Sequence, residues 1–136
     1  MSRKLNVALC AALAVAACNE QPYQPPANQI VKVRSTEQEQ LKQLDAFNLA
    51  IGLKRAIYDA GYTCKRVTDA GFVGEWKNLD MWMAHCIYDS GAPRDWAIFA
   101  GPDGSAQVRD CKDIPGSGLP DCKIAARPKG SFTAVK

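Results

Sequence analysis

The segment that decides the fold is residues 35–61, with the sequence STEQEQLKQLDAFNLAIGLKRAIYDAG. It opens with two possible capping boxes, one beginning at Ser35 and one at Thr36, and acidic side chains occupy the first turn, where the helix dipole favours them. Gly61 is a typical residue just beyond a helix C-terminus. The segment therefore predicts one continuous amphipathic helix of about 24 residues.

Apolar residues recur along this segment at helical spacing. Five fall near one stripe, and five more widen it; they are Leu41, Leu44, Phe47, Ile51 and Tyr58, with Ala46, Leu49, Ala50, Leu53 and Ile57. This face is too wide for the seam of a two-stranded coiled coil, so we expect it to cover a sheet. An amphipathic helix can also lie on a membrane, but the exposed charges here are mixed rather than basic, which favours packing in a core.

Four runs with strand-like composition follow the helix, at residues 62–67, 81–88, 96–100 and 105–111. Residues 68–79 contain two glycines and an asparagine and are interpreted as a loop or an irregular hairpin. The other connections are short turns without helices, which predicts antiparallel pairing. The predicted fold class is α+β: one long N-terminal amphipathic helix packed on a four-stranded antiparallel meander.

The chain has six cysteines, of which two lie in the N-terminal segment. The other four, an even number, predict two disulfides in an oxidising compartment, with three possible connectivities. Cys64 and Cys86 fall near the middles of consecutive predicted strands, and Cys111 and Cys122 bracket a loop rich in glycine and proline. We favour the pairs Cys64–Cys86 and Cys111–Cys122 over the alternatives.

The N-terminus has the features of a secretory signal. Arg3 and Lys4 are positive, and residues 5–17 are apolar apart from Asn6. This segment is too short to span a bilayer stably but suits the apolar region of a signal peptide. The run Ala14-Val15-Ala16 offers an ordinary cleavage site, so simple secretion is one alternative, and a retained membrane anchor is another.

The run Val15-Ala16-Ala17-Cys18 closes this segment. It resembles the lipobox of bacterial lipoproteins, a branched apolar residue and two small residues followed by cysteine. The resemblance implies that Cys18 is the first residue of the mature protein and carries acyl chains such as palmitate on its sulfur and its α-amino group. Several acyl chains anchor a protein stably in a membrane. In this family an aspartate after the cysteine commonly retains the protein at the inner membrane, so Asn19 points to the outer membrane, on its periplasmic face.

The chain then divides into four parts: a signal peptide (1–17), a lipidated cysteine with a flexible Pro/Gln-rich tether (18–34), one disulfide-containing domain (35–124) and a basic flexible tail (125–136). The tether can extend up to about 50 Å. Without residues 1–17 the chain has 15 basic and 14 acidic side chains and no basic stripe. This balance argues against nucleic acid as a partner.

No catalytic motif, metal site or cofactor site is predicted. His85 is the only histidine, and the chain has no G-x-S-x-G, H-E-x-x-H or C-x-x-C pattern. The calcium-loop pattern is also missing. Asp80, Asp89 and Asp95 remain candidates for acid–base chemistry with His85 only because carboxylates pair in space rather than in sequence. The chain is therefore predicted not to be an enzyme.

Aromatic residues supply the remaining candidate site. A helix covers only one face of a sheet, so the other can present large apolar groups; the possible binding surface is Trp76, Trp82, Tyr88 and Trp96. Alternatively, residues 68–79 fold over that face. The body loosely resembles small envelope lipoproteins built as a helix on an antiparallel sheet, some of which act as accessory subunits or inhibitors.

The favoured function is a non-catalytic lipoprotein, anchored in the membrane by its lipid, that binds another envelope component such as a protein. The first alternative is a binder of a small molecule or glycan through the aromatic sheet face. The second and weaker alternative is a hydrolase. A partner that co-purifies from membranes would support the partner-binding lipoprotein. A deep cleft would support the ligand binder or the hydrolase.

Overall fold

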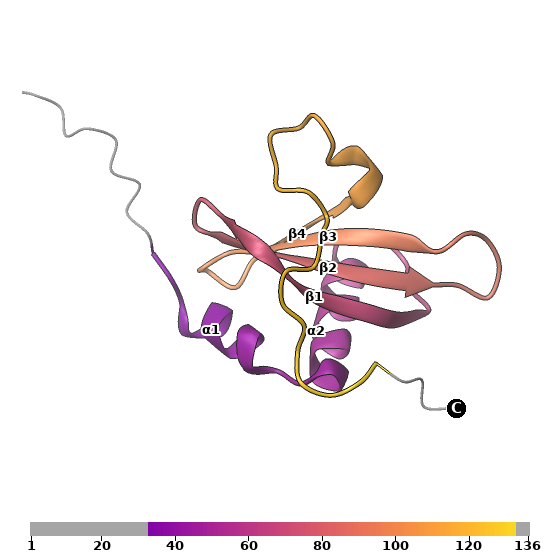
Figure 1. Ribbon diagram of the computed structural model, residues 1–136, viewed down its shortest axis with the longest axis horizontal. Helices are drawn as coiled ribbons and strands as arrows, with labels where there is room; N and C mark the ends of the chain where they lie inside the picture. The colour runs from indigo at the N-terminus through magenta and orange to yellow at the C-terminus, as the bar shows by residue number, and fades with distance from the viewer. Residues whose placement is uncertain (1–32, 133–136) are drawn as a thin grey trace, which may run out of the picture.

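The order of elements is two helices followed by four strands. The computed structural model describes residues 33–132, so the predicted signal peptide, Cys18 and most of the tether lie outside the described residues. The elements are α1 (Thr36–Gln43), α2 (Ala46–Asp59), β1 (Arg66–Trp76), β2 (Leu79–Ile87), β3 (Arg94–Ala100), β4 (Ala106–Asp110) and the 3-10 turn η1 (Cys111–Asp113). The strands form one antiparallel sheet in chain order, and both helices lie on one side of it (Figure 1). The predicted α+β class and four-stranded antiparallel meander are confirmed.

The prediction of one long helix is wrong, because the chain breaks at Leu44 and Asp45. Leu44 is extended, with ψ at 143°, and the Asp45 carboxylate accepts a hydrogen bond of 2.8 Å from the Asn48 backbone N–H. Aspartate is among the best N-cap residues, so this local bond competes with a continuous helix and starts α2 afresh. Of the two possible capping boxes at the start of α1, the structure has the one at Ser35.

The break also changes which residues face the sheet. The buried side chains of α2 are Ala46, Leu49, Leu53 and Ile57. Three others that the sequence placed on the apolar face point to solvent; Phe47 is 61 % exposed, Ile51 51 % and Tyr58 49 %. Both sets fall at helical spacing, with steps of three, four or seven residues, so spacing alone does not distinguish them. Packing against the sheet selects the first set.

The first hairpin is longer than expected. Residues 68–76, predicted to be a loop or an irregular hairpin, belong to β1, and a tight turn at Lys77 leads into β2. Two register shifts interrupt the pairing of β1 with β2, one after Val67 and one after Phe72. Each inserts an extra residue as in a β-bulge, which reverses the alternation of side chains between faces. Because of the bulges, the sequence of β1 lacks the regular alternation of apolar and polar residues that indicates a strand.

One face of the sheet is covered by the helices, and one end of the other face is covered by a loop. On one side α2 packs against Trp82, Ala84, Trp96 and Ile98. On the other, Met81, Ala97 and Phe99 pack under Ile114 of the loop that follows β4. Figure 1 shows this loop, in orange, on the side of the sheet opposite the helices.

The two disulfides are Cys64–Cys86 and Cys111–Cys122, the pairs favoured from the sequence. Cys64 lies just before β1 rather than within a strand, and both Cys64 and Cys86 are fully buried in the core beneath α2. The second disulfide closes the loop that carries Ile114. Each bond therefore fixes a segment outside the regular sheet onto one of its two faces.

An ionic cluster fixes the N-terminal end of the described chain. The Arg34 guanidinium donates hydrogen bonds to Asp80, at 2.8 and 3.0 Å, and to Glu39 and Glu75. Asp80 is fully buried, and Lys42 lies 3.4 Å from its carboxylate. A buried carboxylate needs such partners, since an unpaired charge is costly to bury. The hydrogen bond from Arg34 holds the pKa of the exposed Glu39 carboxyl below its ordinary value.

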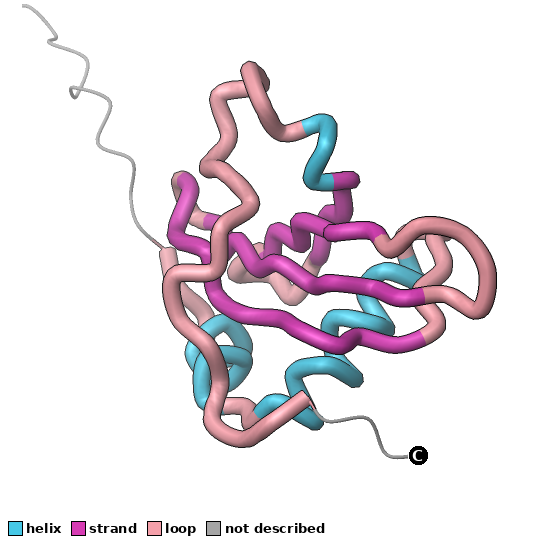
Figure 2. Tube along the Cα trace, turned by 45° about the vertical axis from the view of Figure 1, so that its right-hand side comes forward, coloured by secondary structure: helices cyan, strands magenta, loops and turns pink. Residues whose placement is uncertain are grey.

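Residues 123–132, which we call the C-terminal strap, cross the edge of the sheet at β1. The backbone of Phe72 exchanges hydrogen bonds with Ala125 and Ala126, and the Lys129 carbonyl accepts from the Ala46 N–H at the start of α2. Arg127 pairs with Asp69 at 2.8 Å. The part of the predicted flexible tail that the structure describes is thus packed against the sheet and α2 (Figure 2), because its backbone groups have these partners.

Gly71 lets the strap approach β1. A Cβ atom at this position would lie 2.5 Å from the Ile124 side chain and 2.6 Å from the Ala126 carbonyl oxygen, whereas one at Gly74 would meet nothing within 4 Å.

Gly71→Ala is therefore expected to lower the free energy of unfolding by about 1–3 kcal/mol, the usual cost of overpacking, and Gly74→Ala to leave it nearly unchanged. Urea unfolding of both variants measures this; equal effects would contradict the role of Gly71.

Candidate functional site

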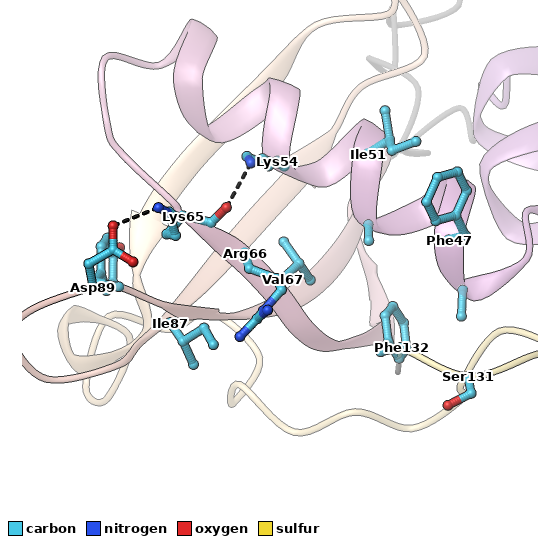
Figure 3. Close-up of a pocket in the computed structure, with 13 residues that line it drawn as sticks. Phe47, Ile51, Lys54, Lys65, Arg66, Val67, Ile87, Asp89, Ser131 and Phe132 are labelled. Carbon is cyan, nitrogen blue, oxygen red and sulfur yellow. Dashed lines mark hydrogen bonds and ion pairs between the residues drawn. The ribbon is translucent and has the colours of Figure 1, made fainter. Parts of the chain in front are cut away.

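The candidate site is a groove between α2 and the N-terminal end of β1, with a volume of about 420 Å³. We call it the α2–β1 groove. Figure 3 shows its lining, which comes from α2, the start of β1, the end of β2 and the strap; it comprises Ala46, Phe47, Ala50, Ile51, Lys54, Lys65, Arg66, Val67, Ile87, Tyr88, Asp89, Ser131 and Phe132. Small-molecule sites usually occupy about 300–1,000 Å³, so the groove is large enough for a ligand.

One end of the groove is apolar. Phe47 and Ile51 project from the first two turns of α2, and Phe132 of the strap lies across from them (Figure 3). Val67 is only 6 % exposed and belongs to the core, so it forms part of the wall rather than a free side chain. Because α2 uses a different stripe for the core, Phe47 and Ile51 are left at the surface. This end can therefore accept a hydrocarbon group.

The other end is basic. The Lys54 ammonium donates a hydrogen bond of 2.8 Å to the Lys65 carbonyl, and the Lys65 ammonium pairs with Asp89 at 2.6 Å. Among the residues that the structure describes, neither Lys54 nor Arg66 has a carboxylate partner. The only acid in the lining is thus already paired, whereas Lys54 and Arg66 lie on opposite sides of β1, because Arg66 shares with Ile87 the sheet face that points away from α2.

Two of the four residues of the predicted aromatic binding surface are buried. Trp82 is 3 % exposed and Trp96 2 % exposed, because both lie on the sheet face that packs against α2. Trp76 lies at the far end of β1, under the Lys77 ammonium. Tyr88 alone lines the groove, and its hydroxyl donates to the Thr63 carbonyl and accepts from the Trp96 indole. The four side chains do not converge on one surface.

Of the three acidic candidates, only Asp95 lies beside His85. His85 Nδ1 lies 2.5 Å from an Asp95 carboxylate oxygen, on the sheet face opposite α2. Its nearest neighbours along β2 on that face are Met83 and Ile87. Asp80 is buried with Arg34, and Asp89 is paired with Lys65 at the groove. The histidine–carboxylate pair therefore has no serine or cysteine beside it in the strand register.

Within residues 33–132, no three His, Cys, Asp or Glu side chains are placed to hold a metal ion. None of the helices in this part of the chain is long and apolar enough to cross a membrane. Comparison with protein-family models, curated proteins and solved structures gave no match to this chain. The α2–β1 groove is taken as the candidate site because large apolar side chains, Phe47, Ile51 and Phe132, line it.

Most of the lining is not marked as a site by the sequence, including the apolar residues Phe47, Ile51 and Phe132. Asp45 could have indicated that Phe47 and Ile51 are exposed, because an N-cap at that position fixes which stripe of α2 faces the sheet. The signal for Phe132 was an isolated large aromatic in an otherwise small and basic segment. Neither signal specifies a groove without the tertiary packing.

If Phe47 and Ile51 serve binding rather than folding, they are replaceable without loss of stability. The double variant Phe47→Ser with Ile51→Ser is expected to change the free energy of unfolding by less than about 1 kcal/mol, since both side chains are exposed. Leu53→Ala, in the buried stripe of the same helix, is expected to cost about 2–5 kcal/mol. Thermal and urea unfolding compare them; a loss as large as that of Leu53→Ala would assign the pair to the core.

Proposed function

We propose that this chain is a non-catalytic, membrane-anchored binding protein of the bacterial envelope, and that the α2–β1 groove binds another envelope component. The observation that carries the proposal is the exposure of Phe47 and Ile51 beside the groove. A helix on a sheet normally turns its large apolar residues inward, and an apolar patch bordered by charges marks an interaction site.

The membrane anchor is supported by the sequence and by the disulfides. The run at residues 15–18 follows the lipobox pattern, which makes Cys18 the acylated residue. Two disulfides suit an oxidising compartment such as the periplasm. Asn19 in place of aspartate favours the outer membrane and its periplasmic face. In this proposal residues 18–33 link the lipid to the domain, which the Arg34–Asp80 pair holds at its first described residues.

A non-catalytic role is favoured by the lining of the groove. It contains no histidine or cysteine, and its one carboxylate, Asp89, is paired with Lys65, so the lining lacks the usual general base that activates a nucleophile. The hydrolase alternative rests on the His85–Asp95 pair, which lies on another face of the sheet. For the alternative in which the chain binds a small molecule, the groove replaces the aromatic surface as the candidate ligand site, since Trp82 and Trp96 are buried.

The anchor is tested by metabolic labelling with palmitate in bacterial cells. Wild-type protein is expected to be labelled and to fractionate with membranes, and Cys18→Ala to be unlabelled and soluble with both disulfides formed, because acylation needs the thiol. Cys10→Ala is the matched control and is expected to behave as wild type. Label that persists in Cys18→Ala would refute the assignment of the anchor.

Binding at the groove is tested by photo-crosslinking of full-length protein in its native membranes. A benzophenone amino acid at Ile51 is expected to give a discrete adduct, of a protein or of a lipid, because this position is exposed beside the groove. The control position is Gln107 on β4, which is also exposed but lies at the opposite edge of the sheet. The absence of an adduct at Ile51, or the same adducts at both positions, would contradict the proposal.

A further inference from the structure

We infer that the surface around Tyr62 binds a saccharide, at a second site whose lining shares only Tyr88 with the α2–β1 groove. Two hollows of about 390 and 450 Å³ adjoin there, and both are lined by Tyr62, Arg94 and Trp96. The first extends over the turns that precede β1 and follow β2, and the second extends over β4 and η1. We call the pair of hollows the Tyr62 cleft.

Tyr62 supplies a flat apolar surface in the cleft. Its ring packs on the buried indole of Trp96, with the ring centroids 4.6 Å apart, and Tyr62 remains 43 % exposed. The Trp96 indole donates to the Tyr88 hydroxyl at 3.3 Å, and that hydroxyl donates to the Thr63 carbonyl at 2.7 Å. These contacts hold the rings in place before a ligand arrives, which lowers the entropic cost of binding. The C–H face of a pyranose ring packs on such an aromatic surface.

Groups that donate and accept hydrogen bonds lie beside this ring. Arg94 is on the same face of β3 as Trp96, since the two are two residues apart in a regularly paired strand, and its side chain is 54 % exposed. The Asp110 carboxylate, opposite Trp96 on β4, lies 3.9 Å from the Arg94 guanidinium and 3.3 Å from the Lys112 ammonium. Two donors thus flank one acceptor. A sugar hydroxyl both donates and accepts, so it suits this mixture.

A nucleotide fits the cleft less well than a saccharide. Its base would also stack on Tyr62, but its phosphate is negatively charged and offers only acceptor oxygens. A phosphate placed beside Arg94 also meets the Asp110 carboxylate, which repels it. An uncharged sugar has no such conflict.

The cleft lies far from the point where the tether enters the domain. Arg34 binds Asp80 near the start of β2, whereas Tyr88 directly follows the last residue of that strand. Eight residues of extended chain separate Asp80 from Tyr88, which corresponds to roughly 27 Å. Figure 1 shows the first described residues and the β2–β3 turn at opposite ends of the sheet. In the proposed lipid-anchored protein, the anchor therefore leaves the cleft open to a polymeric glycan. This point rests on the proposed function, whereas the cleft itself does not.

The test is chemical-shift mapping by NMR on the full chain carrying Cys18→Ala, which removes the site of acylation. The probes are chitotriose and maltotriose, two neutral oligosaccharides, and uridine monophosphate, which has a base and a phosphate. We expect at least one saccharide to bind at millimolar concentration and to shift the amide signals of residues 61–63, 88–94 and 108–112. The signals of Phe47 and Ile51 are expected not to shift, and uridine monophosphate is expected to bind more weakly.

Variants then locate the ligand. Tyr62→Ala is expected to weaken saccharide binding about tenfold, through loss of apolar contact with one ring face. Tyr62→Phe keeps the ring and is expected to retain most of the affinity. Arg94→Gln is also expected to weaken binding, and it changes an exposed side chain, so it decides the question if Tyr62→Ala does not fold. Tyr58→Ala is the matched control, since Tyr58 is 49 % exposed near the same end of α2 but lines neither hollow. Circular dichroism checks that each variant is folded.

The inference is overturned if neither saccharide binds, if uridine monophosphate binds as tightly as the better saccharide, or if Tyr62→Ala and Arg94→Gln both behave like Tyr58→Ala. Shifts confined to the surroundings of Phe47 and Ile51 would also overturn it, but would leave the groove standing as a binding site. Conversely, shifts centred on Tyr62 without an adduct at Ile51 would support the cleft and contradict the proposed role of the groove.

Discussion

The structure depends on one constraint: the sheet is apolar on both faces, so both must be covered. Trp82, Ala84 and Cys86 of β2 point to one side, and Met81 points to the other. An isolated four-stranded sheet cannot bury two apolar faces against itself. The helices cover one face, and the loop closed by Cys111–Cys122 covers the end of the other where Met81 lies. The disulfide loop is therefore a second layer of the domain.

The groove is a by-product of how the first face is covered. Helix α2 directs Leu49, Leu53 and Ile57 toward the two buried tryptophans, and this orientation leaves its flank, with Phe47 and Ile51, beside the edge of the sheet. The start of β1 and the end of the strap complete the opposite wall. The same rotation of the helix thus determines both the core and the candidate binding surface, so the site needs no additional element.

The sequence predicts the order of elements, the antiparallel sheet and both disulfides, because these depend on local composition and on cysteine spacing. It fails where two local preferences compete. Asp45 fits the middle of an amphipathic pattern as well as an N-cap. The cap is selected by two hydrogen bonds, one from the Asn48 N–H to the Asp45 carboxylate and one from the Ala46 N–H to the Lys129 carbonyl. In β1 the bulges disturb the alternation that marks a strand. The groove was not predictable, since Phe47 and Phe132 come together only through contacts between distant segments.

The strap has a consequence for how the protein behaves at high local concentration. An unpaired strand edge is a template for pairing with another chain, and sheets that expose long edges aggregate. Here the strap bridges the middle of β1 at Phe72, and the opposite edge is β4, which is only five residues long. Both margins of the sheet are therefore unsuited to joining with a neighbouring molecule. At high local concentration, this limits uncontrolled polymerisation through the edges of the sheet.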